Sequence, residues 1–546
     1  MTNKINLVGR CIIEYDGCSV KVNPSNDRIF HVIPQGEYFV NIVLPIVDIH
    51  FSWFSTAGRD SGIPPDWKGY RKIKPNIDLP LVSFYNSNGV NRCTLALSDS
   101  TNPVDMEYGV SEEMKEIIIK ISRQSSREFS LYLDFSKTPF YRAVMNASTW
   151  MHSFYRILGV PSRALSPVYS TWYSMHQNVS DREVEEEARL AKEIGFESII
   201  LDDGWQTLDN SRGYRFTGDW EFEIKKFPDP AGHVKRVREM GLNYVIWMAL
   251  PFIGLGSKAI QKFSNSLLRI DERAGTGIID PENMPAIEHI SGRVRYIMDL
   301  GFDGIKADFI DSITDPEERS EKYTSIINFL EKTLEPTRGK LIEFRQRYIS
   351  PSMLQFATMV RSFDCPGDPV ENWIRIINTR LISGKIPVHS DPLMWNNDET
   401  PENVVFNIAS VLFAVPQVSV KLVNEKPENI EVLRKWLGFW KENKEVLMDG
   451  NFEAGHPEIN FATASSKLGS RRITVYRSLT IVDIGHDEEL IVNASHEPLL
   501  VKCQDERDCI IRDFIFEETG MVRIHRGINI VDVSFCGQLY IPINGV

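Results

Sequence analysis

Charged side chains that could carry out a reaction gather in the middle part of this chain. They fall at or near the ends of short apolar runs and comprise Asp202, Asp203, Asp308, Arg345, Asp364 and Asp391. Two carboxyl groups on opposite sides of a glycosidic bond can supply an acid and a nucleophile, and carboxylates accept hydrogen bonds from sugar hydroxyls. Tryptophan faces pack on the apolar C–H surfaces of sugar rings. These residue types therefore suit a sugar ligand.

Eight apolar runs of strand length position these side chains, and helix-length amphipathic segments separate the runs. The runs are Val168–Tyr173, Ser198–Asp203, Tyr244–Ala249, Gly304–Phe309, Lys340–Arg345, Met359–Asp364, Pro387–Asp391 and Val415–Val420. After the first run, Ser180-Asp-Arg-Glu183 is a capping box that begins an amphipathic helix ending at Gly195. This alternation predicts an α/β fold, a (β/α)8 TIM barrel, whose active site lies at the C-terminal ends of its strands. A doubly wound open sheet is the alternative, although it would not ordinarily need eight units.

Each strand-end acid also has a purely structural interpretation. An aspartate at this position often caps the helix that follows the strand. Capping does not easily explain so many acids converging at one end of a barrel together with tryptophans and arginines. The pattern as a whole therefore favours an active site.

The two flanks of the chain have a different composition from its middle. Short alternating segments such as Phe39–Leu44 and Glu116–Ile121 predict a β-sandwich over residues 1–150. Segments such as Arg472–Arg477 and Gly527–Val533 predict a second, antiparallel β-sandwich over residues 446–546. The catalytic barrel is then expected over residues 151–445. Three domains agree with a length of 546 residues.

Composition and missing motifs exclude several other classes of function. The chain carries 61 Lys and Arg against 74 Asp and Glu, a net charge of −13, which argues against binding a nucleic-acid backbone. The sequence lacks a His-Glu-x-x-His motif, an Asp-x-Asp-x-Asp-Gly loop, a phosphate-binding loop and a Gly-x-Ser-x-Gly elbow. No metal or cofactor is therefore expected. The seven cysteines are scattered and do not indicate a disulfide framework.

The first residues lack the basic and apolar regions of a secretory signal, so the chain as given is expected to be cytoplasmic. The uncharged stretch Asn403–Val420 contains Asn407, Pro416 and Gln417. These residues favour a buried helix that runs into a strand over a membrane span.

Five motifs in the middle of the chain together resemble glycoside hydrolase family 36. This is the α-galactosidase or melibiase-like family, in a clan with families 27 and 31, and it also contains raffinose-synthase-type enzymes. The motifs are Ile200-Leu-Asp-Asp-Gly-Trp-Gln206, Thr217-Gly-Asp-Trp220, Lys226-Phe-Pro228, Gly241-Leu-Asn-Tyr-Val-Ile-Trp247 and Gly301-Phe-Asp-Gly-Ile-Lys-Ala-Asp308. The family's architecture of a barrel between two β-sandwiches also resembles the one expected here.

The resemblance implies a role for several of these residues. Asp308 corresponds to the nucleophile, and Asp202 with Asp203 to the acidic pair that grips the sugar hydroxyls farthest from the cleaved bond. Trp172 and Trp220 correspond to positions that line the same pocket. Lys306, two positions before Asp308, faces the same way and is expected to hold hydroxyls and to keep Asp308 ionised.

The general acid has two candidates, Asp364 and Asp368. Asp364 is preferred because it ends its strand, whereas Asp368 resembles the N-cap of the helix through Arg380. Arg361 would lower the pKa of a neighbouring carboxyl, whereas an acid needs a raised one, so Arg361 is expected to bind substrate or to orient the pair.

The fifth strand departs from the family pattern. It carries Glu343 and Arg345 on one face, where many family members have a Cys-Ser-Gly-Gly-Gly-Arg loop that senses the substituent at sugar C2. Glu343 and Arg345 are therefore expected to contact the substrate, and the sugar's identity stays open.

The family resemblance implies a retaining, exo-acting α-galactosidase that hydrolyses terminal α-galactosides of small oligosaccharides by double displacement. A raffinose-synthase-like galactosyl transferase or an α-N-acetylgalactosaminidase is the alternative within the clan. A non-catalytic carbohydrate-binding protein is a more distant alternative. Neither a nucleic acid nor a membrane is an expected partner.

Overall fold

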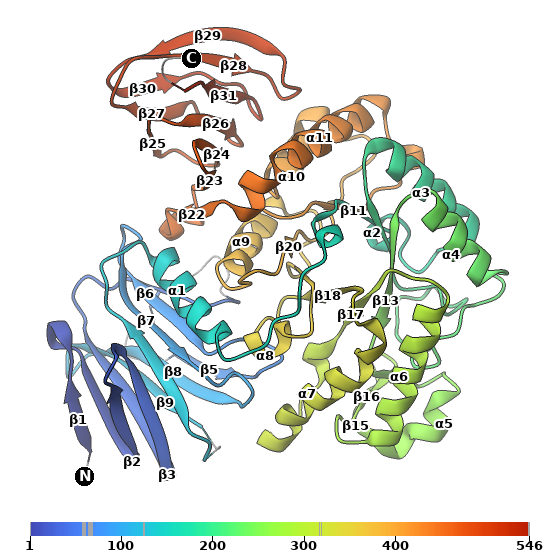
Figure 1. Cartoon of the computed structure of the whole chain (residues 1–546), viewed down its shortest axis with the longest axis horizontal. Coiled ribbons are helices and arrows are strands. Elements are labelled where there is room, and N and C mark those ends of the chain that lie inside the picture. Colours follow the sequence, from blue (N-terminus) through green and yellow to red (C-terminus); the bar gives the residue numbers. More distant parts are fainter. Residues whose placement is uncertain are drawn as a thin grey trace.

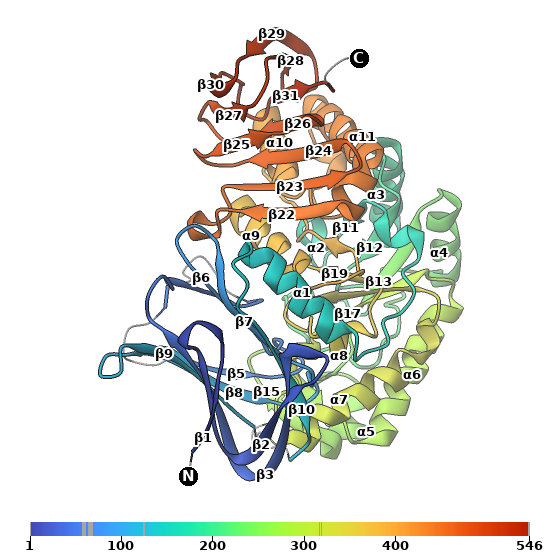
Figure 2. The same ribbon diagram turned by 60° about the vertical axis from the view of Figure 1, so that its left-hand side comes forward.

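The computed structural model describes residues 2–56, 62–63, 69–123, 126–315, 317 and 319–543. A barrel with surrounding helices occupies the middle of the chain, and strands from the two ends of the chain form separate β regions beside it (Figures 1 and 2). Among the described residues, no helix combines the length and the apolar character needed to cross a membrane.

The central part is a nearly closed barrel of eight parallel strands. The strands are β11 (Val168–Ser170), β12 (Ser198–Leu201), β13 (Asn243–Ala249), β17 (Gly304–Asp308), β18 (Leu341–Arg345), β19 (Met359–Arg361), β20 (Val388–His389) and β21 (Gln417–Val418). The sheet follows chain order from β11 to β20, and β21 pairs with β11. A bridge from His389 to Val415, just before β21, spans the remaining opening. All eight predicted strands are therefore present in one parallel sheet, in agreement with a barrel and not with a doubly wound order.

Several of these strands are shorter than predicted. Trp172 and Tyr173 belong to a one-turn helix, α2 (Trp172–Met175), and not to the first strand. Asp202, Asp364 and Asp391 lie beyond the ends of β12, β19 and β20. The chain leaves the sheet at the barrel mouth, so these residues lie in the loops after the strands.

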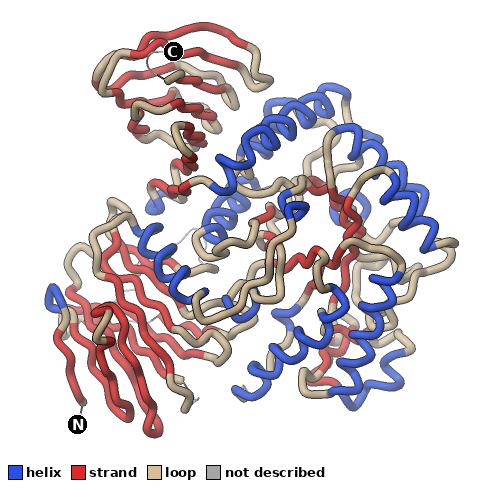
Figure 3. The backbone as a smooth tube through the Cα atoms, viewed as in Figure 1, coloured by secondary structure: helices blue, strands red, loops and turns tan. Residues whose placement is uncertain are grey.

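Helices cover the outside of the barrel, as the blue coils of Figure 3 show. They are α3 (Asp181–Ile194), α4 (Pro230–Glu239), α5 (Ala259–Phe263), α6 (Met284–Asp299), α7 (Ser320–Thr333), α8 (Pro351–Leu354), α9 (Pro369–Arg380), α10 (Pro401–Ala409) and α11 (Pro427–Asp449). A small sheet of β14 (Phe252–Gly254), β15 (Leu267–Asp271) and β16 (Thr276–Ile279) lies between β13 and α6 in the sequence.

Two local predictions in this region are confirmed. The Ser180 side chain accepts a hydrogen bond from the amide of Glu183, and Gly195 ends α3 with φ +120°. Asn403–Val420 contains most of α10, which buries Val404 and Ile408, and continues into β21.

The N-terminal region is one hydrogen-bonded sheet of ten strands. The strands are β1 (Asn3–Asn6), β2 (Ile12–Asn23), β3 (Asn26–Pro45), β4 (Phe51–Trp53), β5 (Gly69–Ile73), β6 (Leu81–Tyr85), β7 (Asn91–Leu97), β8 (Val104–Ser111), β9 (Glu116–Ser122) and β10 (Phe129–Asp134). Ile73 from one end of the sheet and Val82 from near the other belong to one buried cluster. The sheet therefore curls around a single core, which differs in detail from the predicted pair of sheets.

The C-terminal region consists of two sheets that share a core. The larger sheet contains β22 (Asn451–Gly455), β23 (Thr463–Leu468), β24 (Arg471–Tyr476), β26 (Glu488–Asn493), β28 (Arg507–Arg512), β29 (Glu518–Ile524) and β31 (Gln538–Ile541). The smaller contains β25 (Ile481–Ile484), β27 (Leu499–Cys503) and β30 (Gly527–Val531). Val482 and Val501 of the smaller sheet pack with Ile491 and Leu539 of the larger one. The predicted antiparallel order is incomplete, because β24 pairs with β26, and β25 with β27, in parallel.

The N-terminal sheet contacts the mouth of the barrel directly. Helix α1 (Phe140–His152) packs on β6 and β7. The buried Asn76 side chain donates hydrogen bonds of 2.8 Å each to the carbonyls of Ile310 and Ile313, in the loop after β17. The Gln346 amide, directly after β18, donates to the carbonyl of Ser55 at 2.8 Å. The N-terminal region therefore holds two of the loops that carry the candidate site.

Candidate active site

Asp308 ends β17 and is almost completely buried, with 7% exposure. Its Oδ1 accepts hydrogen bonds from Arg345 Nε at 2.6 Å, the Phe309 amide at 2.8 Å and the Tyr348 hydroxyl at 3.3 Å. Its Oδ2 accepts a hydrogen bond of 3.0 Å from Trp247 Nε1, its one donor among the described residues. Oδ2 is therefore the less occupied of the two oxygens.

The charges around Asp308 keep its carboxyl ionised. Burial alone would raise the pKa of Asp308, but Arg345 and, more weakly, Lys306 and Arg361 lower that pKa well below its usual value. An ionised carboxylate with one lightly occupied oxygen has the properties of a nucleophile.

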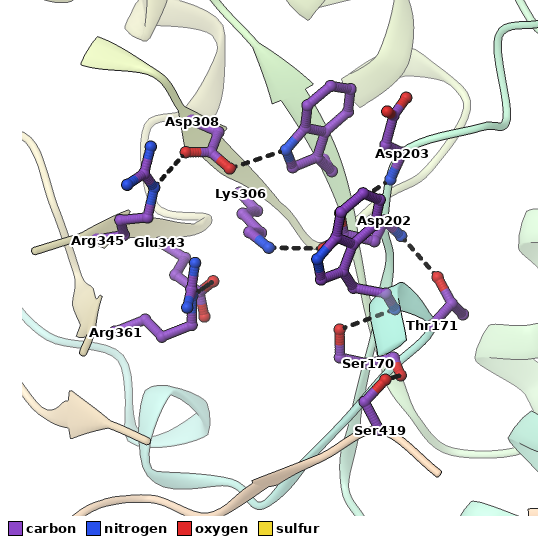
Figure 4. A network of polar contacts seen from close by, with 12 residues as sticks. Ser170, Thr171, Asp202, Asp203, Lys306, Asp308, Glu343, Arg345, Arg361 and Ser419 are labelled. Carbon is purple, nitrogen blue, oxygen red and sulfur yellow. Dashed lines mark hydrogen bonds and ion pairs between the residues drawn. The ribbon is translucent and has the colours of Figure 1, made fainter. Parts of the chain in front are cut away.

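Lys306 and Asp202 form a buried ion pair across the barrel mouth, as Figure 4 shows. Lys306 Nζ lies 2.6 Å from Asp202 Oδ2. Burial lowers the pKa of Lys306, but Asp202 outweighs it with help from Asp308 and Glu343, so the net shift is upward. The ammonium group of Lys306 therefore binds Asp202, and its charge also lowers the pKa of Asp308.

Asp203 is 1% exposed and lies beside Asp202. Gln206 Nε2 donates to its Oδ1 and Gln177 Nε2 to its Oδ2, at 2.7 Å each. Burial raises the pKa of Asp203 to about 6. The predicted acidic pair is therefore present, with Asp202 bound to a cation and Asp203 to two amides.

The Arg361 guanidinium contacts one carboxylate in the loop after its own strand, β19, and another in the loop after the next strand, β20. Its Nη2 lies 2.8 Å from Asp364 Oδ1, and its Nη1 is hydrogen-bonded to Asp391 Oδ1. The Asp364 side chain is 47% exposed, whereas Asp391 is 1% exposed. Burial raises the pKa of Asp364, but Arg361 and Arg345 lower it below its usual value. As the sequence indicated, Arg361 does not contact Asp364 alone.

Asp368, the other candidate acid, is the N-cap of α9. Its Oδ1 accepts a hydrogen bond of 2.9 Å from the amide of Glu371. The prediction that Asp368 caps this helix is therefore confirmed, and it leaves Asp364 as the more accessible carboxyl at the mouth.

Glu343 and Arg345 both point inward from β18, as their spacing predicted, but they contact different groups. Arg345 binds Asp308 and, at 3.3 Å, Asp311. Glu343 is completely buried and accepts a hydrogen bond of 2.6 Å from Gln417. The second carboxylate oxygen of Glu343 lies 3.9 Å from Arg361 Nε and has no hydrogen-bond partner among the residues that the structure describes. Glu343 therefore retains a free acceptor beneath the site.

The two predicted aromatic residues differ in their surroundings. Trp172 is half-buried at the start of α2, with the Arg212 guanidinium 5.2 Å from its ring. Trp220 is completely buried between Trp205 and Trp247, with ring centroids 5.9 and 5.8 Å away. In this structure Trp220 therefore supports Trp247, which binds Asp308, and has no exposed surface of its own.

Four residues at this site were given no individual role in the sequence analysis. Trp247 and Tyr348 donate to Asp308, whereas Asp391 and Tyr173 are hydrogen-bonded to each other. Asp391 and Tyr173 end predicted strands and Trp247 ends one of the five family motifs, whereas no motif or predicted strand contains Tyr348. In the described part of the chain, no group of three or more His, Cys, Asp or Glu residues could hold a metal ion.

Known proteins resemble this chain in one segment of its sequence and in its fold. The Melibiase family model matches residues 140–330. α-Galactosidase 1 of Pediococcus pentosaceus is 28% identical over 150 residues, which are 27% of this chain and 18% of that protein. The fold resembles that of the GH36 α-galactosidase AgaA from Geobacillus stearothermophilus in complex with raffinose, with a TM-score of 0.67 and 12% identity over 98% of this chain and 81% of that chain.

Residues 140–330 thus match the Melibiase family, and the whole chain resembles a GH36 α-galactosidase in fold. This GH36-like chain is also 33% identical over 105 residues to an α-xylosidase of Emericella nidulans, a match that covers 17% of this chain and 14% of that protein. The matched segments thus span less than a fifth of either curated relative.

Proposed function

We propose that this protein is a retaining, exo-acting glycoside hydrolase that removes terminal α-galactose from small oligosaccharides. The buried and ionised Asp308 carries the proposal, because its Oδ2 has a single donor in the described part of the chain and its charge acts on Asp364. The match of residues 140–330 to the Melibiase family model and the similarity to an α-galactosidase support the choice of sugar.

In the first step, Asp308 Oδ2 attacks the anomeric carbon while the Asp364 carboxyl gives its proton to the departing glycosidic oxygen. The hydrogen bonds to Oδ1 hold the nucleophile in place. A bound sugar removes water from the half-exposed Asp364, and this desolvation raises its pKa toward the value that an acid needs.

In the second step, Asp364, now ionised, takes a proton from water, and the resulting hydroxide oxygen displaces Asp308 from the sugar. Asp202 and Asp203 lie where their free acceptor positions can bind sugar hydroxyls. The Lys306 ammonium fixes Asp202 in that orientation.

Asp308 and Asp364 would also serve transfer of the sugar to a sugar acceptor, so relative rates with water and with an acceptor separate hydrolysis from transglycosylation. We also propose that the protein is located in the cytoplasm, and cell fractionation would test this proposal.

The decisive experiment removes the proposed nucleophile. Asp308→Ala should abolish turnover of an α-galactoside in a folded protein, and added azide should occupy the vacated space to give a galactosyl azide of inverted configuration. With the wild-type protein, NMR should show that the α anomer of the product forms first. More than a few per cent of wild-type activity in Asp308→Ala without azide would remove Asp308 from this role.

Cleavage of an α-xyloside is the second candidate function. Its support is the 33% identity to an α-xylosidase and the presence of Glu343 and Arg345 on the fifth strand in place of the α-galactosidase loop. Turnover of a panel of nitrophenyl α-galactoside, α-xyloside, α-N-acetylgalactosaminide and β-glycosides decides between these substrates. A protein that binds sugars and cleaves none of the panel would instead be the non-catalytic alternative.

A further inference from the structure

Arg361 lies between the proposed acid and a second carboxylate that the mechanism does not use. One arm of its guanidinium reaches Asp364, 2.8 Å away, and the other arm is hydrogen-bonded to Asp391. Arg361 is 2% exposed and Asp391 1%. The two closest partners of this buried cation are therefore carboxylates of very different exposure, and a third, Glu343, lies farther away, 3.9 Å from Arg361 Nε.

The remaining contacts of Asp391 hold it away from any substrate. Its Oδ2 accepts hydrogen bonds from the Cys365 amide at 2.9 Å and from the Tyr173 hydroxyl at 3.1 Å. Both of its oxygens are thus occupied by protein donors. Cys365 directly follows Asp364, so Asp391 binds both the backbone next to the proposed acid and the cation that faces it.

We propose that Asp391 is a positioning residue that offsets the charge of Arg361 and so keeps the Asp364 carboxyl able to act as an acid. This inference rests on the proposed function. Without Asp391, Arg361 would have only the more distant Glu343 as a second anion and would stabilise the ionised form of Asp364 more strongly, which is the wrong direction for a proton donor. A buried carboxylate on the opposite arm of the guanidinium reduces that effect without taking part in the reaction.

Other ionisable groups around this triad set the background for the effect. They are Asp308, Lys306, Glu343, Arg345, Tyr173, Glu371 and Arg375. Arg345 acts on Asp364 in the same direction as Arg361, and Asp308 acts in the opposite one. Burial raises the pKa of Asp391 to about 6 although Arg361 lowers it, so Asp391 is charged above about pH 6. Asp391 and Asp364 share one cation, so their titrations are coupled.

The test compares neutral and charged replacements of Asp391. Asp391→Asn and Asp391→Ser remove the charge, while the new side chain can still accept from the Cys365 amide; Asp391→Glu keeps the charge. Asp303→Asn is the matched control, because Asp303 is also buried and paired with Arg163 and Arg238, but at the opposite end of β17. Thermal unfolding identifies which neutral variant is folded.

The main readout is kcat against pH with an unactivated α-galactoside such as raffinose, for which bond cleavage needs the acid. In Asp391→Asn and Asp391→Ser we expect the alkaline limb of the kcat profile to move to lower pH by about one unit, because removing one nearby charge shifts a pKa by about that much. Above that limb the rate on raffinose should fall about tenfold, and the rate on an activated nitrophenyl α-galactoside much less. In Asp391→Glu and Asp303→Asn the alkaline limb should stay at the pH of the wild-type protein.

Three results would overturn the inference. A folded neutral variant with an unmoved limb means that Asp391 does not act on the acid, and equal losses on both substrates mean that its role is only structural. A wild-type protein that cleaves none of the glycoside panel would overturn the proposed function and this inference with it. An active wild-type protein with unmoved limbs in the variants would refute this inference alone.

Discussion

Arg345→Met should move the acid limb of activity to higher pH by removing the cation that keeps Asp308 ionised. Arg345 Nε lies 2.6 Å from Asp308 Oδ1, and both side chains are less than 10% exposed. Methionine keeps an apolar stem of similar length and removes the charge. The nucleophile must be ionised to attack, so its pKa appears as the acid limb of kcat/KM.

The size of the shift follows from the geometry of this pair. Two unit charges about 4 Å apart interact by about 4 kcal/mol at an effective dielectric constant of about 20, which corresponds to about 3 pKa units. Lys306 and Arg361 remain in the variant and continue to lower the pKa of Asp308. We therefore expect the acid limb to rise by about 1 to 3 pH units.

The assay measures kcat/KM on a nitrophenyl α-galactoside from acid to neutral pH. Arg347→Met is the matched control, because Arg347 is exposed two positions after Arg345, and its guanidinium lies 4.8 Å from the Phe363 ring. An acid limb that stays in place in an active Arg345→Met protein would refute the electrostatic reasoning. A limb that moves equally in Arg347→Met would show that the effect is not specific to the pair.

The same substitution should affect stability with a defined sign. Because Arg345 depresses the pKa of Asp308 in the folded state, the pair stabilises the fold fully above the pKa of an unfolded aspartate, about 3.9. This contribution is lost as the pH falls through the lower folded pKa. Breaking a buried pair costs about 3–5 kcal/mol, so thermal unfolding should show a large loss at pH 7 and a smaller one near pH 3.

Two further predictions concern the acid and a helix cap. Asp364→Ala should still attack a nitrophenyl α-galactoside but should cleave raffinose about 10²–10⁴-fold more slowly, and added azide should restore deglycosylation. Asp368→Ala should show neither the loss on raffinose nor the response to azide. The opposite result would make Asp368 the acid. Ser180→Ala should lower the free energy of unfolding by about 1 kcal/mol because it removes the cap of α3. Arg182→Ala, exposed in the same turn, is its control in chemical denaturation, and equal losses in both variants would contradict a capping role.

The sequence alone determined the parts of this protein that depend on local patterns. Apolar runs predicted all eight strands of the barrel, and the capping box at Ser180 predicted the start of α3. The positions of acids after those runs predicted Asp202, Asp308 and Asp364 at one end of the barrel, because parallel strands all end at the same mouth. These inferences need only periodicity and chain direction.

Strand ends and the shape of the flanking sheets were less predictable. Trp172 and Tyr173 continue an apolar run but belong to α2, because the chain leaves the sheet at the mouth. Alternating segments at the N-terminus predicted strands, whereas pairing between distant segments decided that the sheet curls around one core.

The partners of the site residues depended entirely on tertiary structure. Lys306 binds Asp202, 104 positions away, although its spacing pointed to Asp308. Arg361 binds Asp391, 30 positions away, and the burial of Trp220 comes from tryptophans on other segments. Periodicity shows which way a side chain points, but contacts and burial, and therefore the pKa of each carboxyl, depend on which strands the fold places next to one another.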